Sequence, residues 1–333
     1  MGKLFIKGSF VALITPFNKA GKVDFDGFKT LIDFQATNGT SAVLIMGSTG
    51  EVSTLSIEEK QKIISSTMKF KNSELLQLYG CTGNTTQGTI EMVKYAASEG
   101  ADGAIITVPS YIVPSVEAAV QYYIEVADAS SIPIGIYNNP TRVGTDLTAE
   151  AIIKLASHPN IIIDKEAMGR PSQISKISAA KTDISLMCCD SPNLGLIIPV
   201  MALGGHGTAN VTGNIAPQEM AMISKPWESF EDALNCRETY LKISPLLFFN
   251  YSKINPVPIK SLMKALGLPS GDLRKPNLNM DSQALGVGIK IVKELGLSEK
   301  YDFSIPDELI PKDEATTIQT ESASSNGSIK CSV

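Results

Sequence analysis

The chain has 333 residues, of which 43% are hydrophobic and 19% are charged. This composition predicts a globular protein and excludes a disordered chain, and the length fits two domains or one large α/β barrel with additions. The net charge of −5 at pH 7 argues against a basic surface for nucleic acids, so we expect small molecules or further copies of the chain as partners.

Short apolar runs alternate with longer helical patterns over the first 211 residues. The eight runs are 10–14, 42–46, 75–79, 103–108, 134–137, 161–165, 184–188 and 207–211. Helical patterns between them include 24–38, 56–71, 86–99, 116–130 and 148–157, and Ser56-Ile57-Glu58-Glu59 has the pattern of a capping box. Near-continuous apolar strands joined by helical crossovers predict a parallel sheet covered on both faces. Eight such units predict a closed (β/α)8 TIM barrel.

An open doubly wound sheet is the alternative to a barrel. It is less favoured, because Thr15-Pro16-Phe17 stands where a dinucleotide-binding sheet would have its glycine-rich turn. Beyond Trp227 the pattern is helical only, over 228–251, 256–266 and 283–295. We therefore divide the chain into a catalytic barrel at 1–226, a C-terminal helical appendage at 227–300 and a polar tail at 301–333 that we expect to be disordered.

The numbers of cysteines and histidines indicate whether the chain binds a metal, and its apolar runs indicate where in the cell it is found. The five cysteines form no C-x-x-C pair and are accompanied by only two histidines, so we predict no metal site. The N-terminus lacks the apolar run of a signal peptide, and no apolar stretch reaches the roughly 18 residues of a membrane span. We expect a reduced, soluble, cytoplasmic protein that does not enter a membrane.

Active sites of barrels of this kind lie at the carboxyl ends of the strands, so polar residues just beyond each apolar run are candidates. These residues are Ser48 and Thr49 after the second run, Tyr111 after the fourth, Tyr137 and Arg142 at and after the fifth, and Lys165 at the end of the sixth. His206, among glycines before the eighth run, is expected to be structural.

Lys165 is the most informative of these residues. Three isoleucines precede it and would deliver its amine to the barrel mouth, where loss of water favours the neutral form that attacks carbonyls. The alternative is a rim lysine paired with Asp164 or Glu166. Because side chains alternate along a strand, Lys165 shares a face with Ile163 while the two carboxylates share the other. The carboxylates need not neutralise Lys165 directly.

The remaining candidates each have a functional and an ordinary interpretation. The loop 47–51 offers two hydroxyls between glycines, either as a nest for a carboxylate or as an ordinary turn. Tyr137 is either catalytic or a core tyrosine with a satisfied hydroxyl. Arg142 lies in a loop bounded by proline and glycine. Its guanidinium either binds a carboxylate through two hydrogen bonds or is simply exposed to solvent. Tyr111, between two prolines, would project outward, across a subunit contact or onto a neighbouring loop.

Several motifs together resemble a known superfamily over about residues 5–297. They are Gly8-Ser9-Phe10-Val11-Ala12 through Thr15-Pro16-Phe17, the loop 47–51, Tyr137-Asn138 through Arg142-Val143-Gly144, Lys165-Glu166-Ala167, and Asn255-Pro256-Val257-Pro258-Ile259-Lys260. In this order and spacing the chain is similar to the dihydrodipicolinate synthases and N-acetylneuraminate lyases, which are pyruvate-dependent class I aldolases.

The resemblance implies a role for each site residue. Lys165 would form a Schiff base with the keto carbon of pyruvate, and Ser48 and chiefly Thr49 would hold its carboxylate, with Ala209 lining the other side. Tyr137 would donate and accept protons, linked through Ser48 to Tyr111 of a neighbouring subunit. A homotetramer built from tight dimers is therefore implied, with neither a metal nor a dissociable cofactor, because the lysine supplies the electron sink as an iminium.

Arg142 in its N-P-T-R-V-G setting resembles the synthase branch, in which this arginine meets the carboxylate of aspartate semialdehyde. The implied reaction condenses pyruvate with L-aspartate-4-semialdehyde to 4-hydroxy-tetrahydrodipicolinate, on the diaminopimelate route to lysine. Two alternatives stay open at this point. One is another pyruvate-dependent aldolase or hydratase that acts on a sugar acid or a 2-keto acid, and the other is an inactive binding protein on the same barrel.

The chain departs from the synthase pattern in three places. Ser48 replaces the usual relay threonine, which loosens its rotamer. Cys188-Cys189-Asp190 stands where Gly-Asp-Asp or Gly-Asp-Glu is common, so a cysteine would narrow the pocket for the second substrate and a polar contact would be lost. At the positions of the allosteric lysine site Asn84 is kept, while Ile57, Lys60, Gly88 and Ser110 occupy the others. Without an acid at position 88 we predict weak or absent inhibition by lysine.

Overall fold

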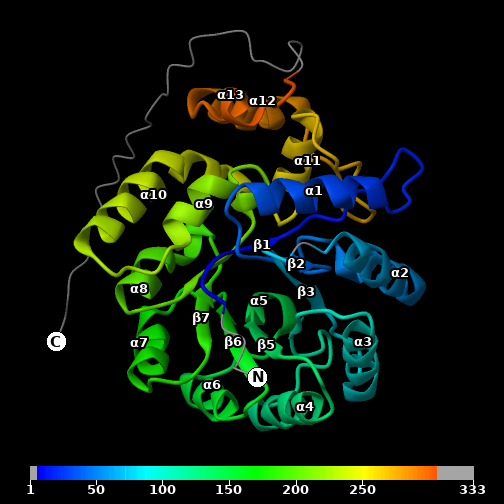
Figure 1. Cartoon of the computed structure of the whole chain (residues 1–333), viewed down its shortest axis with the longest axis vertical. Coiled ribbons are helices and arrows are strands. Elements are labelled where there is room, and N and C mark those ends of the chain that lie inside the picture. Colours follow the sequence, from blue (N-terminus) through cyan, green and yellow to red (C-terminus); the bar gives the residue numbers. More distant parts are fainter. Residues whose placement is uncertain (1–5, 72, 306–333) are drawn as a thin grey trace, which may run out of the picture.

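The computed structural model describes residues 6–71 and 73–305. Eight parallel strands form a closed barrel in chain order, with β1 pairing with both β2 and β8 (Figure 1). The strands are β1 Gly8–Ala12, β2 Ala42–Ile45, β3 Leu76–Gly80, β4 Gly103–Ile106, β5 Ile134–Asn138, β6 Ile161–Glu166, β7 Ser185–Cys188 and β8 Gly207–Asn210. The predicted (β/α)8 barrel is confirmed, because each apolar run supplies one strand within a few residues of its expected bounds.

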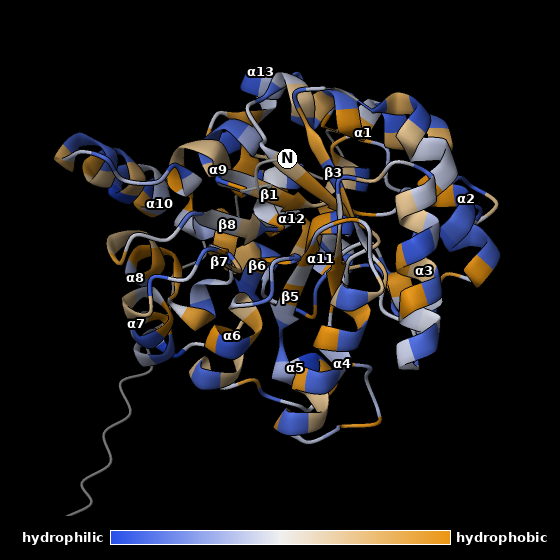
Figure 2. Cartoon of the chain, turned by 60° about the horizontal axis from the view of Figure 1, so that its bottom comes forward, coloured by the Kyte–Doolittle hydropathy of each residue, from blue (hydrophilic) through white to orange (hydrophobic). Residues whose placement is uncertain are grey.

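A ring of helices covers the outside of the barrel. Its members are α1 Phe25–Thr37, α2 Ile57–Thr67, α3 Thr86–Ser98, α4 Val116–Asp128, α6 Ala149–Ala156, α7 Pro171–Ala179, α8 Ile197–Ala202 and α9 Pro217–Ser224. Ser56 forms the expected capping box with Glu59 at the start of α2. Most strand residues are apolar, although β8 reads Gly-Thr-Ala-Asn and β6 ends in Asp-Lys-Glu, and the outer helices mix apolar and polar side chains (Figure 2).

Side chains on strand β6 alternate as the sequence predicts. Lys165 pairs in register with Tyr137 and Met187, which belong to the cluster inside the barrel. Asp164 pairs with Ile136 and Leu186, which belong to the cluster between the strands and the outer helices. The lysine therefore faces the barrel interior at its carboxyl end, and its neighbouring carboxylates face the helices.

Four further helices follow the barrel, which agrees with the predicted helical appendage. They are α10 Phe230–Asn250, α11 Val257–Ala265, α12 Ser282–Glu294 and α13 Leu297–Tyr301. The last three lie together beside α1 (Figure 1). Tyr301 and Phe303 pack on Phe34 of α1, with ring centroids 5.5 and 6.3 Å away, so the packed chain continues past residue 300, where we placed the start of a disordered tail. Residues 306–333 of that predicted tail lie outside the described residues.

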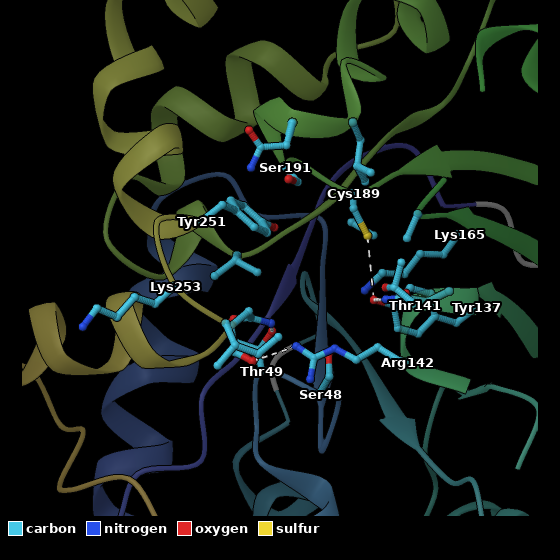
Figure 3. Close-up of a pocket in the computed structure, with 18 of the residues that line it drawn as sticks. Ser48, Thr49, Tyr137, Thr141, Arg142, Lys165, Cys189, Ser191, Tyr251 and Lys253 are labelled. Carbon is cyan, nitrogen blue, oxygen red and sulfur yellow. Dashed lines mark hydrogen bonds between the residues drawn. The ribbon is translucent and has the colours of Figure 1, made fainter. Parts of the chain in front are cut away.

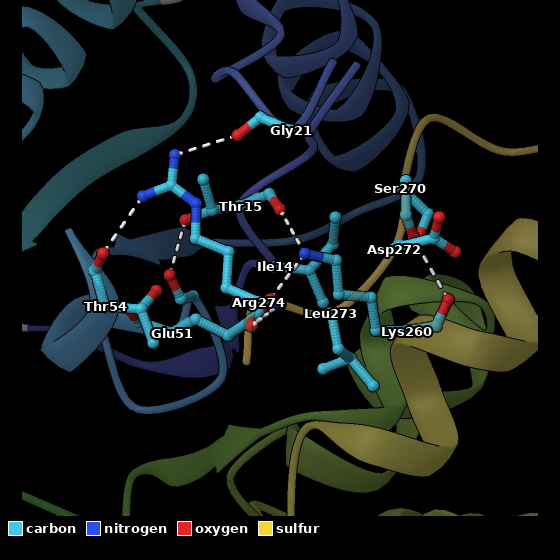
Figure 4. A network of polar contacts seen from close by, with 12 residues as sticks. Ile14, Thr15, Gly21, Glu51, Thr54, Lys260, Ser270, Asp272, Leu273 and Arg274 are labelled. Atoms are coloured by element: carbon cyan, nitrogen blue, oxygen red, sulfur yellow. Dashed lines mark hydrogen bonds and ion pairs between the residues drawn. The ribbon is translucent and has the colours of Figure 1, made fainter. Parts of the chain in front are cut away.

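A buried polar network ties α11 to the loop after β2 (Figure 4). Lys260 forms an ion pair with Glu51 and donates to the carbonyl oxygen of Thr15 at 2.8 Å. The backbone N–H of Arg274 donates to the same Glu51 carboxylate at 2.9 Å, and its guanidinium makes a two-pronged ion pair with Glu59. Because Glu51 ends the loop that carries two predicted site residues, the C-terminal helices help to fix that loop.

Two further features of the fold concern the strand ends and membranes. His206 accepts a hydrogen bond at Nδ1 from the backbone N–H of Leu186 at 3.0 Å, which agrees with the structural role expected for it. Within residues 6–71 and 73–305, none of the helices has the length and apolar character needed to cross a membrane.

Candidate active site

A pocket of about 400 Å³ opens at the carboxyl ends of the strands. Its walls come from the loops after β2, β5 and β7, from β8, and from the connection between α10 and α11. Six of the seven predicted site residues line it, namely Ser48, Thr49, Tyr137, Arg142, Lys165 and Ala209. Figure 3 shows five of these side chains, which come from distant parts of the sequence, directed toward a common space: Ser48, Thr49, Tyr137, Arg142 and Lys165. Tyr111 is not among the residues that line this pocket.

Lys165 lies at the bottom of the pocket and is only 3% exposed. Its Nζ atom is 4.2 Å from the centroid of the Tyr137 ring, the residue beside it on β5. Among the described residues that line the pocket there is no aspartate or glutamate. The amine is thus buried, with no carboxylate among the described residues of the pocket wall.

The two carboxyl groups beside Lys165 in the sequence are held on the opposite side of the strand. Glu166 accepts hydrogen bonds from Asn138 Nδ2 at 2.9 Å and from Gln173 Nε2 at 3.2 Å, and burial nevertheless raises its pKa to about 7. Burial also raises the pKa of Asp164 well above its usual range, and Glu166 adds to the effect. A rim pairing of Lys165 with these groups, the alternative taken from the sequence, is therefore not what the fold produces.

The hydroxyl of Tyr137 has two neighbours in the pocket. Asn139 Nδ2 donates to it at 2.7 Å, and the Cys189 sulfur lies 3.9 Å from it. Burial raises the pKa of Tyr137, Cys189 adds to the rise, and the Asn139 hydrogen bond opposes it. Between the described Ser48 and Tyr137 side chains no direct hydrogen bond is formed, so the first link of the expected proton relay is not closed in this structure.

Tyr111 stands apart from the other candidates. It lies in the loop between β4 and α4 with a backbone φ of 72° and a side chain that is 99% exposed. A tyrosine in this left-handed conformation presents its ring outward, as the flanking prolines suggested. Within one chain it does not line the pocket, so the structure of a single chain does not bring it into the expected relay.

Thr49 and Arg142 are connected through a residue that sequence reasoning did not select. Asn255 Nδ2 donates to Thr49 Oγ1 at 3.0 Å, and a guanidinium nitrogen of Arg142 donates to the backbone oxygen of Asn255 at 2.8 Å. Asn255 lies in the connection between α10 and α11, where its Asn-Pro motif belongs to the resemblance. That motif was the signal that could have identified it as part of the site.

The two cysteines after β7 separate in the structure. Cys189 lines the pocket beside Tyr137, whereas Cys188 packs in the outer core. The expectation that the cysteine at the usual glycine position narrows the pocket is therefore wrong, because Cys188 faces the helices and does not line the pocket. Asp190 is directed away from the pocket and accepts from the backbone N–H groups of Val211 and Thr212 at 3.0 and 2.9 Å.

Tyr251 is another pocket residue that the sequence did not single out. Its hydroxyl donates to Asp190 at 2.5 Å, and burial raises its pKa. It joins the end of α10 to the carboxyl ends of β7 and β8.

Within the described part of the chain, no three histidine, cysteine or acidic side chains come together as a metal site. The expected independence from cofactors stays a prediction.

Known proteins similar to this chain agree with the motifs. The model of the Dihydrodipicolinate synthetase family matches residues 5–295. The 4-hydroxy-tetrahydrodipicolinate synthase of Syntrophotalea carbinolica is 37% identical to this chain, over 87% of this chain and 98% of the relative. That of Geotalea daltonii is 36% identical, over 87% of this chain and 99% of the relative. The crystal structure of the synthase from Cyanidioschyzon merolae with lysine bound superposes with a TM-score of 0.84 at 29% identity, covering 89% of this chain and all of the other. The chain therefore belongs to the dihydrodipicolinate synthetase family.

Proposed function

We propose that this chain is a 4-hydroxy-tetrahydrodipicolinate synthase, a lyase that condenses pyruvate with L-aspartate-4-semialdehyde through a Schiff base on Lys165. The observation that carries the proposal is the buried amine of Lys165 in a pocket that no carboxylate of residues 6–71 and 73–305 lines. Family membership and two synthases at 36% and 37% identity over nearly their whole length support the same reaction. None of these observations favours the other aldolases or the inactive binding protein considered from the sequence.

The first half of the reaction activates pyruvate. The neutral amine of Lys165 adds to the keto carbon, and one of its protons passes to the former carbonyl oxygen to give a carbinolamine. A second proton, supplied by an acid, then lets this oxygen leave as water, which gives an iminium. Loss of a proton from the methyl carbon then converts the iminium into an enamine. We assign these proton transfers to the Tyr137 hydroxyl, and its support is that Tyr137 lines the pocket with its ring beside Nζ of Lys165.

The second half joins the two substrates. The enamine carbon attacks the aldehyde carbon, the aldehyde oxygen takes up a proton, and the amino group of the acceptor then displaces Lys165 as the ring closes. Thr49 and the loop around it would hold the pyruvate carboxylate, and Arg142 would hold the carboxylate of the acceptor. Asn255 links these two residues, so both carboxylates are positioned by one connected group of side chains.

The active unit is an oligomer, because Tyr111 does not line the pocket of its own chain and would join the site from another copy. Its 99% exposure in one chain, next to exposed Ile112 and Val113, supports a contact between copies at this loop. We place it in a tight dimer, two of which form a homotetramer. Full activity in a monomeric sample would contradict the shared site.

Trapping by borohydride tests the proposal. Protein incubated with pyruvate and borohydride should gain the mass of a reduced pyruvate adduct on the peptide that contains Lys165, and samples lacking either reagent serve as controls. A panel of aldehydes should then give condensation with aspartate semialdehyde above sugar-acid aldehydes, and Arg142→Ala should reduce that preference. Absence of the adduct, or a better sugar-acid substrate that is indifferent to Arg142, would contradict the assignment.

Inhibition by lysine stays a prediction. The structure from Cyanidioschyzon merolae has lysine bound. At the positions where the resemblance places the allosteric lysine site, this chain has Ile57, Lys60, Gly88 and Ser110. We expect L-lysine to leave the condensation rate nearly unchanged at millimolar concentration, because the ammonium of the ligand would lack a carboxylate partner.

A further inference from the structure

Asn139 occupies an unusual place in the pocket. It directly precedes α5 Pro140–Val143, yet its side chain makes no hydrogen bond to the backbone of that short helix. The side chain is instead buried and lines the pocket. Both ends of its amide are engaged there, since Thr141 Oγ1 donates to Oδ1 at 2.6 Å and Nδ2 donates to the Tyr137 hydroxyl at 2.7 Å.

The direction of the Asn139 hydrogen bond decides what Tyr137 can do. A phenol has one proton to donate, and its oxygen can accept hydrogen bonds as well. Here the oxygen accepts from Asn139 at 2.7 Å, whereas the Cys189 sulfur is 3.9 Å away. The phenol proton is thus not used by Asn139 and can be directed to a group in the pocket. In the reverse orientation of the amide, Tyr137 would donate to Oδ1 and its proton would be withheld from a substrate.

The same bond also changes the energy of proton transfer. An N–H donor on the phenol oxygen stabilises the phenolate more than the phenol, because hydrogen bonds to charged groups are the stronger ones. Burial acts in the opposite sense by raising the pKa of Tyr137, and the Asn139 bond partly offsets that rise. Asn139 would therefore both orient the proton and ease its departure.

We propose that Asn139, held by Thr141, is a positioning residue for Tyr137 that turns its hydroxyl proton toward the pyruvate adduct on Lys165. The inference rests on the function proposed above and extends it to a residue outside the predicted site. In the balanced step, the Tyr137 O–H bond breaks and its proton goes to the oxygen of the carbinolamine. The C–O bond then breaks, water leaves, and the phenolate regains a proton when the methyl carbon of the iminium is deprotonated.

Two substitutions of nearly equal size separate this geometry from its reverse. Asn139→Asp presents oxygens that only accept, so it would draw the Tyr137 proton to itself, whereas Asn139→Leu removes the bond altogether. We expect kcat to fall roughly 10²-fold in the aspartate variant and at least about tenfold in the leucine variant, with KM for pyruvate within about threefold. Thr141→Val should have a smaller effect, since Asn139 keeps its bond to Tyr137. Asn235→Asp on α10 adds the same charge outside the pocket and is the matched control.

The rates should be expressed per Lys165 adduct trapped by borohydride, so that unfolded protein does not contribute. Two readouts report the proton transfers themselves: the exchange of deuterium from solvent into the pyruvate methyl group, and the alkaline limb of kcat against pH. Both Asn139 variants should slow the exchange and move the limb to higher pH, which lost packing alone would not do.

The outcomes are distinct. Full activity in Asn139→Asp with a loss in Asn139→Leu would show that Tyr137 donates to Asn139, and would overturn the proposed direction. Wild-type exchange rates in both variants would overturn any positioning role, while adduct formation on Lys165 would leave the proposed function standing. A wild-type protein that forms no adduct with pyruvate would instead refute the proposed function, and the inference would fall with it.

Discussion

Two buried lysines, Lys165 and Lys260, occupy contrasting surroundings. Each amine lies over an aromatic ring, 4.2 Å from the centroid of Tyr137 for Lys165 and 3.9 Å from that of Phe17 for Lys260. Lys260 is fully buried but forms an ion pair with Glu51. Lys165 is 3% exposed and lies in a pocket whose described wall has no acidic side chain.

The difference between the two lysines lies in the counter-charge. Burial lowers the pKa of Lys260 to about 8 although Glu51 opposes the effect, so the amine stays protonated at pH 7 and the pair links α11 to the loop after β2. Lys165 has only the ring of Tyr137 in place of such a counter-charge, and a buried amine without a carboxylate partner costs folding free energy, so such groups are typical of functional sites. We interpret Lys260 as structural and Lys165 as reactive, although both are buried to nearly the same extent.

The largest effect is expected from Lys165→Arg, which keeps the positive charge but cannot form a Schiff base. The rate of condensation should fall at least about 10³-fold, because covalent catalysis is lost while binding groups remain. Borohydride should trap no pyruvate on this variant, and its unfolding curve should remain cooperative. Lys290→Arg on the exposed side of α12 is the matched control. A Lys165→Arg protein with near wild-type turnover would exclude the mechanism.

The second test removes the paired lysine. Lys260→Met leaves the carboxylate of Glu51 buried without its cation, and the free energy of unfolding should fall by about 3–5 kcal/mol. Adding Glu51→Gln should restore part of that loss, since no unpaired charge then remains. Urea unfolding of the single and double variants measures both values. Equal stability of Lys260→Met and wild type would mean that the ion pair has no structural role.

The contrast between the two lysines was only partly predictable from the sequence. The apolar run before Lys165 fixes its place at the barrel mouth, and strand alternation separates it from Asp164 and Glu166. Hydrogen bonds between individual side chains were not predictable, because they depend on the rotamer of each side chain and join residues that are far apart in the sequence. The bond between Asn255 and Thr49 spans 206 residues, and that between Tyr251 and Asp190 spans 61. Asn139 lies only two residues from Tyr137, but no periodic pattern indicates the direction of an amide in a loop.

The next prediction concerns the carboxyl group behind Lys165. Burial raises the pKa of Glu166 from 4.5 to about 7, so the folded state favours its protonated form. Its stabilising contribution is complete below pH 4.5 and is lost as the pH rises through 7, by about 3 kcal/mol at most. Unfolding measured between pH 4.5 and 8 should show this decline in the wild type and a flatter profile in Glu166→Gln. An unchanged profile would show that Glu166 is ionised in the folded protein throughout that range.

The smallest effect, and the one that tests the separation of the two faces of β6, is expected at Asp164. Neither carboxyl oxygen has a hydrogen-bond partner among the described residues, and its register neighbours Ile136 and Leu186 are apolar. Asp164→Leu should therefore raise the free energy of unfolding by about 1–2 kcal/mol, whereas Asp164→Asn keeps an unpaired polar group and should change it little. Turnover per trapped Lys165 adduct should stay the same in both variants, because the side chain faces the helices. A leucine variant that is more stable but turns over more slowly would instead show that Asp164 influences Lys165 through the strand. In that case the absence of a carboxylate from the described pocket wall would not be enough to explain why the Lys165 amine is reactive.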